Sequence, residues 1–166
     1  MQMKASTLRR IMNLWPPFLF TGIRVVRISN DYREVEVQLK QHWYNRNYVG
    51  THFGGSLFAM TDPFYMLMLL QRLGSEYIVW DKSASIEYVA PGRGVVTAKF
   101  RLDDITLATI RAQTSDGQKY LPEFTVDVVN AQNELVAQVK KTLYVRRKIP
   151  KVAPAKLEDT LAGPGK

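Results

Sequence analysis

Residues 47–73 read NYVGTHFGGSLFAMTDPFYMLMLLQRL, and this stretch decides the fold. From Gly54 to Leu73 the apolar side chains cover nearly every side of a helical wheel. A helix that is apolar all round is stable only where other elements bury it. The stretch therefore predicts a central helix wrapped by the rest of the chain. It also predicts a kink at Pro63, which has no N–H to donate to the carbonyl of Ala59.

The segments on either side of this helix have the patterns of antiparallel strands. Residues 33–40 alternate apolar with charged or polar side chains, and the polar turn 29–31 joins them to residues 22–28 in a hairpin. Further strand patterns follow the helix, at residues 82–89, 95–102, 122–130 and 135–147. We predict an α+β hotdog fold, in which an antiparallel sheet of five to six strands wraps around one long central helix. Such a sheet has edge strands that need cover, so we expect a homodimer or a dimer of dimers.

Two shorter helices and a tail complete the expected organisation. Ser6 is the expected N-cap of a helix that ends before Pro16-Pro17, and Asp103-Asp104 opens another through Arg111. A chain of 166 residues suffices for one substantial core, so residues 1–148 are predicted to form a single hotdog domain. Residues 149–166, which contain several prolines and lysines, are predicted to be a disordered basic tail.

Charge and cysteine content narrow the choice of partners and compartment. Residues 140–166 contain eight basic and two acidic residues, so most of the net charge of +8 lies there. This distribution favours a solvated last strand and tail over a nucleic-acid surface, and no apolar run approaches the roughly 20 residues of a membrane span. We therefore expect neither nucleic acid nor a membrane as partner. The chain has no cysteine and no apolar run after its basic N-terminus, so we expect a cytoplasmic location.

Chemistry is concentrated where the loop enters the central helix. The N–H groups of Gly54 and Gly55 lie at the positive end of the helix dipole, where they can polarise a thioester carbonyl. Asp62 follows eight residues after Gly54, about two turns along the same helix, and can point at the same pocket as a base or nucleophile. The pattern therefore indicates a site for acyl chemistry at the helix N-terminus.

At this point the chain resembles a known family. The order of Asn47, His52 beside Gly54-Gly55, and then Asp62 is similar to that of hotdog thioesterases of the phenylacetate-pathway (PaaI-like) type. The stretch Ser83 to Pro91 resembles the strand that follows the central helix there. Closer still, the segments 13–17 (NLWPP), 22–26 (GIRVV) and 50–54 (GTHFG), with the Asp103-Asp104 helix, resemble the DUF4442 subfamily of hotdog thioesterase relatives, over about residues 5–148.

The resemblance implies roles, and each has a structural alternative. Asp62 would activate water or attack the thioester, or instead form a structural pair with Thr51, with Asn47 or with an arginine across a dimer. His52 would orient the substrate, although Phe53 occupies the position of the family's histidine and His52 falls one residue early; a local hydrogen bond is the alternative. Asn47 would contact the substrate or simply form a turn. For Gly54 and Gly55, the alternative is a tight helix entry.

Three more residues are candidate substrate contacts. Ser83 and Ser85 share one face of their strand and would line the acyl pocket, or belong to an ordinary wet sheet face. Arg93, in a glycine-rich turn, would meet a phosphate of coenzyme A, or stay an exposed turn residue.

Other chemistries lack their motifs. There is no Gly-x-Ser-x-Gly elbow, no P-loop and no dinucleotide fingerprint, so no organic cofactor is expected. With only His42 and His52, and no Glu-x-x-His, no metal site is expected either. The sequence is therefore interpreted as an acyl-CoA thioesterase, with Asp62, His52 and Gly55 as catalytic candidates and Asn47, Gly54, Ser83, Ser85 and Arg93 as substrate-binding candidates. The alternative is a hotdog module that binds acyl thioesters, or serves assembly, without turnover.

Overall fold

The computed structural model describes residues 3–149. This part of the chain forms five helices and seven strands. In order they are α1 Ala5–Leu14, α2 Pro16–Leu19, β1 Ile23–Ile28, β2 Glu34–Lys40, α3 Gly54–Ala59, α4 Phe64–Leu73, β3 Tyr77–Tyr88, β4 Val95–Arg101, α5 Asp104–Gln113, β5 Lys119–Tyr120, β6 Glu123–Val129 and β7 Leu135–Arg147. The predicted tail is residues 149–166, and all of it except Ile149 lies outside the described residues.

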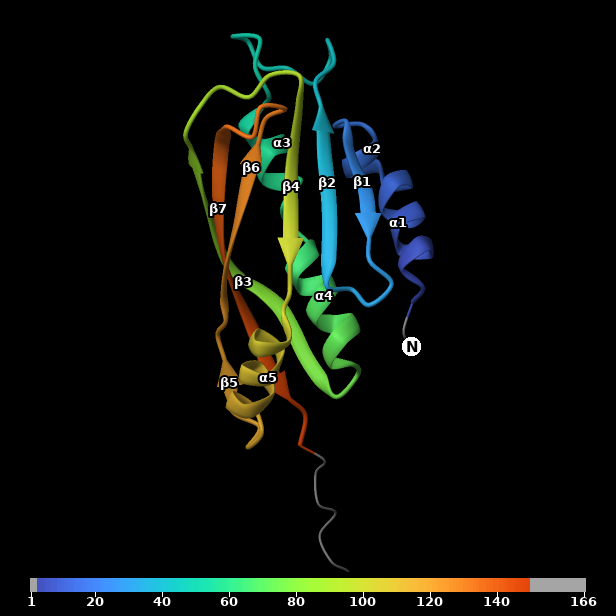
Figure 1. The fold of residues 1–166 in the computed structure, drawn as a ribbon, viewed down its shortest axis with the longest axis vertical. Coiled ribbons are helices and arrows are strands. Elements are labelled where there is room, and N and C mark those ends of the chain that lie inside the picture. Colours follow the sequence, from blue (N-terminus) through green and yellow to red (C-terminus); the bar gives the residue numbers. More distant parts are fainter. Residues whose placement is uncertain (1–2, 150–166) are drawn as a thin grey trace, which may run out of the picture.

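The strands form one antiparallel sheet in the order β1-β2-β4-β6-β7-β3, with the short β5 paired to β7. The sheet curls around α3 and α4, and α1 and α2 lie beside β1 at one edge, while α5 and β5 lie at the far end (Figure 1). This arrangement confirms the predicted α+β architecture. The structure adds a two-residue strand that the sequence pattern does not predict, and β3 begins at Tyr77, five residues earlier than expected.

The central helix is divided into two. Because proline has no N–H and its ring disfavours the helical conformation of the preceding turn, the helix cannot continue through Pro63. α3 ends at Ala59, residues 60–63 form a turn in which the Asp62 N–H donates to the Ala59 carbonyl at 3.2 Å, and α4 begins at Phe64. Asp62 is consequently a turn residue and not a residue of a continuous helix.

The core lies between α4 and the concave face of the sheet. Phe64 is only 1% exposed, and its ring centre is 5.0 Å from that of Phe100 and 6.0 Å from that of Phe18. On the next residue, the Tyr65 ring stacks on Phe124 at 4.3 Å. Aromatic side chains at successive positions of α4 therefore pack against strands β4 and β6 and against α2.

One edge strand of the sheet, β1, is covered by a helix, and the other, β3, is partly exposed. The Asn13 side chain of α1 accepts from the Val25 N–H at 2.7 Å and donates to the Val25 carbonyl at 3.1 Å, which occupies hydrogen-bonding groups of edge strand β1. On the opposite edge, residues 82–85 and 87–90 are exposed, so that nothing among the described residues covers this part of β3. An edge of this kind is available for pairing with another strand.

Of the two helix N-caps predicted from the sequence, one is wrong and one is confirmed. The prediction of Ser6 as N-cap is wrong, because α1 begins at Ala5 after Lys4 and no side chain caps it. The prediction for α5 is confirmed, since the Asp103 carboxylate accepts from the Thr106 N–H at 2.7 Å. Within residues 3–149, no helix has both the length and the apolar character needed to cross a membrane.

Candidate active site

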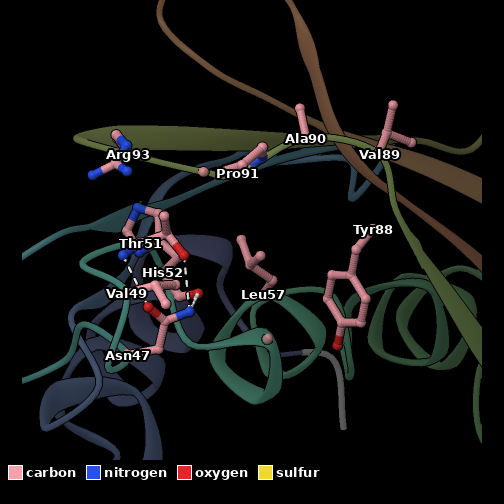
Figure 2. A pocket seen from close by; sticks show the side chains of 12 residues that line it. Asn47, Val49, Thr51, His52, Leu57, Tyr88, Val89, Ala90, Pro91 and Arg93 are labelled. Atoms are coloured by element: carbon pink, nitrogen blue, oxygen red, sulfur yellow. Dashed lines mark hydrogen bonds between the residues drawn. The ribbon is translucent and has the colours of Figure 1, made fainter.

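A cavity of about 580 Å³ opens where the loop 47–53 enters α3. One wall is the segment from Val89 to Arg93 that follows β3, and the opposite wall is the loop that carries Asn47, Thr51 and His52 (Figure 2). Leu57 and Tyr88 lie between these walls, and Gly54 contributes its backbone. The lining is mainly apolar, with a few polar groups, as in many pockets for small molecules.

Asn47 holds the loop together. Its side-chain amide donates to the Thr51 hydroxyl at 2.8 Å and to the His52 carbonyl at 3.2 Å, and its side-chain carbonyl accepts from the Thr51 N–H at 2.9 Å. These bonds occupy both ends of the amide. The turn interpretation of Asn47 is therefore supported by all the contacts of its side chain, and the residue also lines the cavity.

His52 is buried with a defined tautomer. Its side chain is 3% exposed, and Nε2 lies 3.1 Å from the carbonyl oxygen of Gly94. A carbonyl can only accept, so this contact requires the proton on Nε2 and leaves Nδ1 as an acceptor. Nδ1 is buried and has no hydrogen-bond partner among the described residues. Burial lowers the pKa of His52 more than the hydrogen bond to Gly94 raises it, so the ring is neutral.

The two glycines make room for aromatic rings. A Cβ atom on Gly54 would lie 2.8 Å from the Tyr88 hydroxyl oxygen, and one on Gly55 would lie 2.4 Å from the Phe53 ring. Close approach is thus one reason for glycine at both positions. The two N–H groups open the first turn of α3, where N–H groups have no partner within the helix.

Arg93 lies at the exposed rim. It comes from the turn between β3 and β4, and its guanidinium donates to the Gly50 carbonyl at 3.0 Å. This bond uses one N–H group of the guanidinium, and the other N–H donors of the exposed side chain face solvent. A positive charge therefore stands at the mouth of an apolar cavity.

Asp62 lies away from this cavity, in the turn between α3 and α4. Its side chain is 58% exposed, and its Oδ1 lies 3.3 Å from Nζ of Lys141. The same ammonium group lies 3.0 Å from Oδ1 of Asp81 and donates to the backbone carbonyl of Asp62. The partner of Asp62 is therefore a lysine of β7, and not Thr51 or Asn47.

Ser83 and Ser85 line a different cavity, on the outer face of the sheet. Their cross-strand neighbours on β7 are Thr142 and exposed Lys140. Of the eight candidate residues, the structure thus brings together Asn47, His52, Gly54 and Arg93, and it separates Gly55, Asp62, Ser83 and Ser85 from the cavity lining. Within residues 3–149, no three histidine, aspartate or glutamate side chains are grouped so as to hold a metal ion.

Two residues that contact the candidate residues were not singled out by the sequence. Tyr88 covers Gly54 and borders the cavity, and it belongs to the stretch that carries the family resemblance. Lys141 was missed although the strand pattern contains a signal. Its side chain lies on the same face of β7 as those of Val139, Leu143 and Val145, which are all fully buried. A lysine on this inward face needs an anionic partner.

The comparisons with known proteins agree with this architecture. A family model described as "Domain of unknown function (DUF4442)" matches residues 4–145. The chain belongs to the DUF4442 family. Among curated proteins, none matches this DUF4442 protein.

Solved structures similar to this DUF4442 protein include several described as thioesterases. PA5026 of Pseudomonas aeruginosa, described as a protein of unknown function and probable thioesterase, has a TM-score of 0.79 at 17% identity over 89% of this chain and 98% of its own. Thioesterase HI1161 of Haemophilus influenzae has a TM-score of 0.64 at 15% identity, over 92% of this chain and 97% of its own. Thioesterase superfamily member 2 of Mus musculus has a TM-score of 0.60 at 18% identity, over 87% and 98%. These similarities confirm the predicted hotdog fold.

Proposed function

We propose that this DUF4442 protein hydrolyses the thioester bond of a small or medium acyl-CoA. The observation that carries the proposal is the cavity at the start of α3, in which an apolar lining meets the Gly54 backbone and ends at a rim arginine. The acyl chain would occupy the apolar part near Leu57 and Val89, and Arg93 would face the phosphates of coenzyme A. The description of similar structures as thioesterases adds support.

The catalytic carboxylate would come from a second copy of the chain. The residues that line the cavity include no aspartate or glutamate. If two copies pair antiparallel along the exposed edge of β3, the Tyr88 end of one strand lies toward the Tyr77 end of the other. In this arrangement, the cavity beside Tyr88 of one subunit approaches the half of the partner's β3 that carries Asp81. Asp62 lies beside Asp81 within each subunit, because both carboxylates contact the same Lys141. We therefore place the site at the interface of a homodimer.

The reaction would follow general-base chemistry. The Asp62 carboxylate takes a proton from water as the water oxygen bonds to the thioester carbonyl carbon. The N–H group of Gly54, which borders the cavity, stabilises the negative charge that develops on the carbonyl oxygen, and the adjacent Gly55 N–H would assist once the substrate reaches the helix end. The C–S bond then breaks, the sulfur receives the proton, and the products are a carboxylic acid and a thiol. His52, which lines the cavity, would orient the substrate or the water.

A specific observation also favours the second candidate, a module that binds acyl thioesters without turnover. Within one subunit Asp62 lies outside the cavity, and its charge is paired with Lys141. Without a second copy in the register described above, the cavity has binding groups but no base.

Turnover by the purified protein separates the two candidates. Thiol release is measured with a panel of short, long and aromatic acyl-CoAs, for the parent and for Asp62→Asn, with molar mass in solution recorded for both. We expect a dimer or larger assembly that hydrolyses at least one acyl-CoA and loses the activity in Asp62→Asn. Asp104→Asn is the matched control, because Asp104 is exposed and pairs with Arg33 and Arg72. It is the first residue of α5, and α5 lies at the end of the molecule opposite to α3 (Figure 1). No turnover on any substrate, or full turnover in Asp62→Asn, would contradict the proposal.

A further inference from the structure

Lys141 is a buried cation shared by two carboxylates. Its side chain is 1% exposed, and its ammonium group lies 3.3 Å from Oδ1 of Asp62 and 3.0 Å from Oδ1 of Asp81. An ammonium group is not buried without compensation, because losing its water costs several kcal/mol. The sequence places this lysine on the inward face of β7, so the fold itself brings the cation to the turn that carries Asp62.

The surroundings of Lys141 contain few other charges. Across the sheet its neighbours are Phe124 on β6 and Ala84 on β3. From α4, Tyr65 stacks on Phe124, and burial raises the pKa of its hydroxyl to about 12, so it is neutral. Lys141 borders the cavity that Ser83 and Ser85 line, and the other charged residues of that cavity are Lys140 of β7 and Glu123 of β6, both exposed.

The two carboxylates differ in their exposure. The Asp81 side chain is 25% exposed, whereas that of Asp62 is 58% exposed. Burial raises the pKa of Asp81, and Lys141 opposes this rise. Asp81 thus anchors the ammonium group inside, while Asp62 presents its carboxylate to solvent from a turn whose carbonyl the same ammonium group holds.

We propose that Lys141 is a positioning residue that fixes the carboxylate of Asp62, with Asp81 as its anchor, so that Asp62 can take the proton from the attacking water. This inference rests on the proposed function. Lys141 does two things at once: it holds the interrupted helix at Asp62 through the backbone carbonyl, and it keeps a positive charge beside the carboxylate. A displacement of a reacting group by about 1 Å can lower a rate about 100-fold, so the position matters as much as the charge.

The test compares the dependence of kcat on pH in the parent and in two variants with opposite expected effects. Lys141→Met removes the cation at similar side-chain length. We expect kcat to fall about 100-fold with KM within about twofold. The acidic limb of the profile should move to higher pH, because a carboxylate that loses a neighbouring cation takes up a proton more readily. In Asp81→Asn, Asp62 is the one carboxylate of this pair that still faces the Lys141 ammonium group. The acidic limb should therefore move to lower pH.

Lys140→Gln is the matched control. Lys140 is the adjacent residue on the same strand, but it is exposed on the outer face of the sheet. Removal of this charge should leave both kcat and the acidic limb unchanged. Thermal unfolding of each variant shows whether it is folded. If Lys141→Met does not fold, Asp81→Asn decides through kcat: loss of the anchor should lower kcat with KM within about twofold, whereas a purely structural lysine leaves the kcat of this folded variant at the parent value.

The outcomes separate this inference from the proposed function. An active parent, an inactive Asp62→Asn and unmoved acidic limbs in the folded variants would overturn the role of Lys141 alone. A parent without thioesterase activity, or an active Asp62→Asn, would overturn the proposed function and this inference with it.

Discussion

His52 makes the stability of this protein depend on pH, and the size of the effect follows from its burial. The ring is neutral in the folded chain, because burial lowers its pKa below the ordinary value of 6.5. Between the folded and the unfolded pKa, the unfolded chain binds a proton that the folded chain does not. The free energy of unfolding therefore rises with pH. The contribution of His52 is fully present above about pH 7 and is lost as the pH falls below 6.5.

The magnitude can be bounded from the same argument. One pKa unit corresponds to about 1.4 kcal/mol. At pH 5.5, His52 therefore makes the folded state less stable than at pH 7.5 by at most about 1.4 kcal/mol, provided that the buried ring stays neutral. This difference is large enough to resolve by urea unfolding followed by tryptophan fluorescence at the two pH values.

The substitution His52→Gln tests whether His52 causes this pH dependence. The glutamine amide can still donate to the Gly94 carbonyl, but it does not titrate in this range. We expect the difference in unfolding free energy between pH 5.5 and 7.5 to be smaller in the variant than in the parent by up to about 1.4 kcal/mol. His42→Gln, in the preceding loop, is the control for the loss of a histidine. An unchanged difference in His52→Gln would refute the claim that a neutral, buried imidazole lines the cavity.

Three further substitutions test the fold by urea or thermal unfolding. Gly22→Ala should destabilise by at least about 2 kcal/mol, because Gly22 has φ +81° and a Cβ atom there would lie 2.7 Å from the Lys40 carbonyl oxygen; parent-like stability would contradict this. Asp103→Ala should destabilise the protein through loss of the α5 cap, with Asp103→Asn nearly neutral as the control. Phe64→Ala should cost about 3 to 5 kcal/mol, since this fully packed ring leaves a cavity, and a loss below about 1 kcal/mol would show that the core is arranged differently.

The cavity itself was only partly predictable from the sequence. The glycines at the helix entry and the neighbouring His52 indicated the right region, because glycine and a helix N-terminus have local signatures. On the opposite wall, Val89 to Arg93, the glycine-rich turn made Arg93 a candidate, but the sequence does not show that this segment faces His52, since its place depends on how β3 leaves the sheet. Tyr88 therefore became part of the site only through the fold, where it packs on Gly54.

The sequence by itself determined most of the elements and the wrapping of the sheet around the apolar helical stretch. An all-round apolar stretch requires burial, alternation specifies which strand face is inward, and Pro63 interrupts any helix that contains it, all through interactions within a few residues. Only the tertiary structure decided the partner of Asp62. Two turns of uninterrupted helix would direct Asp62 toward the Gly54 end, but the break at Pro63 turns it toward Lys141, which lies 79 residues further along the chain. Such a pairing depends on the register of β7 against β3, and sequence spacing alone does not specify that register.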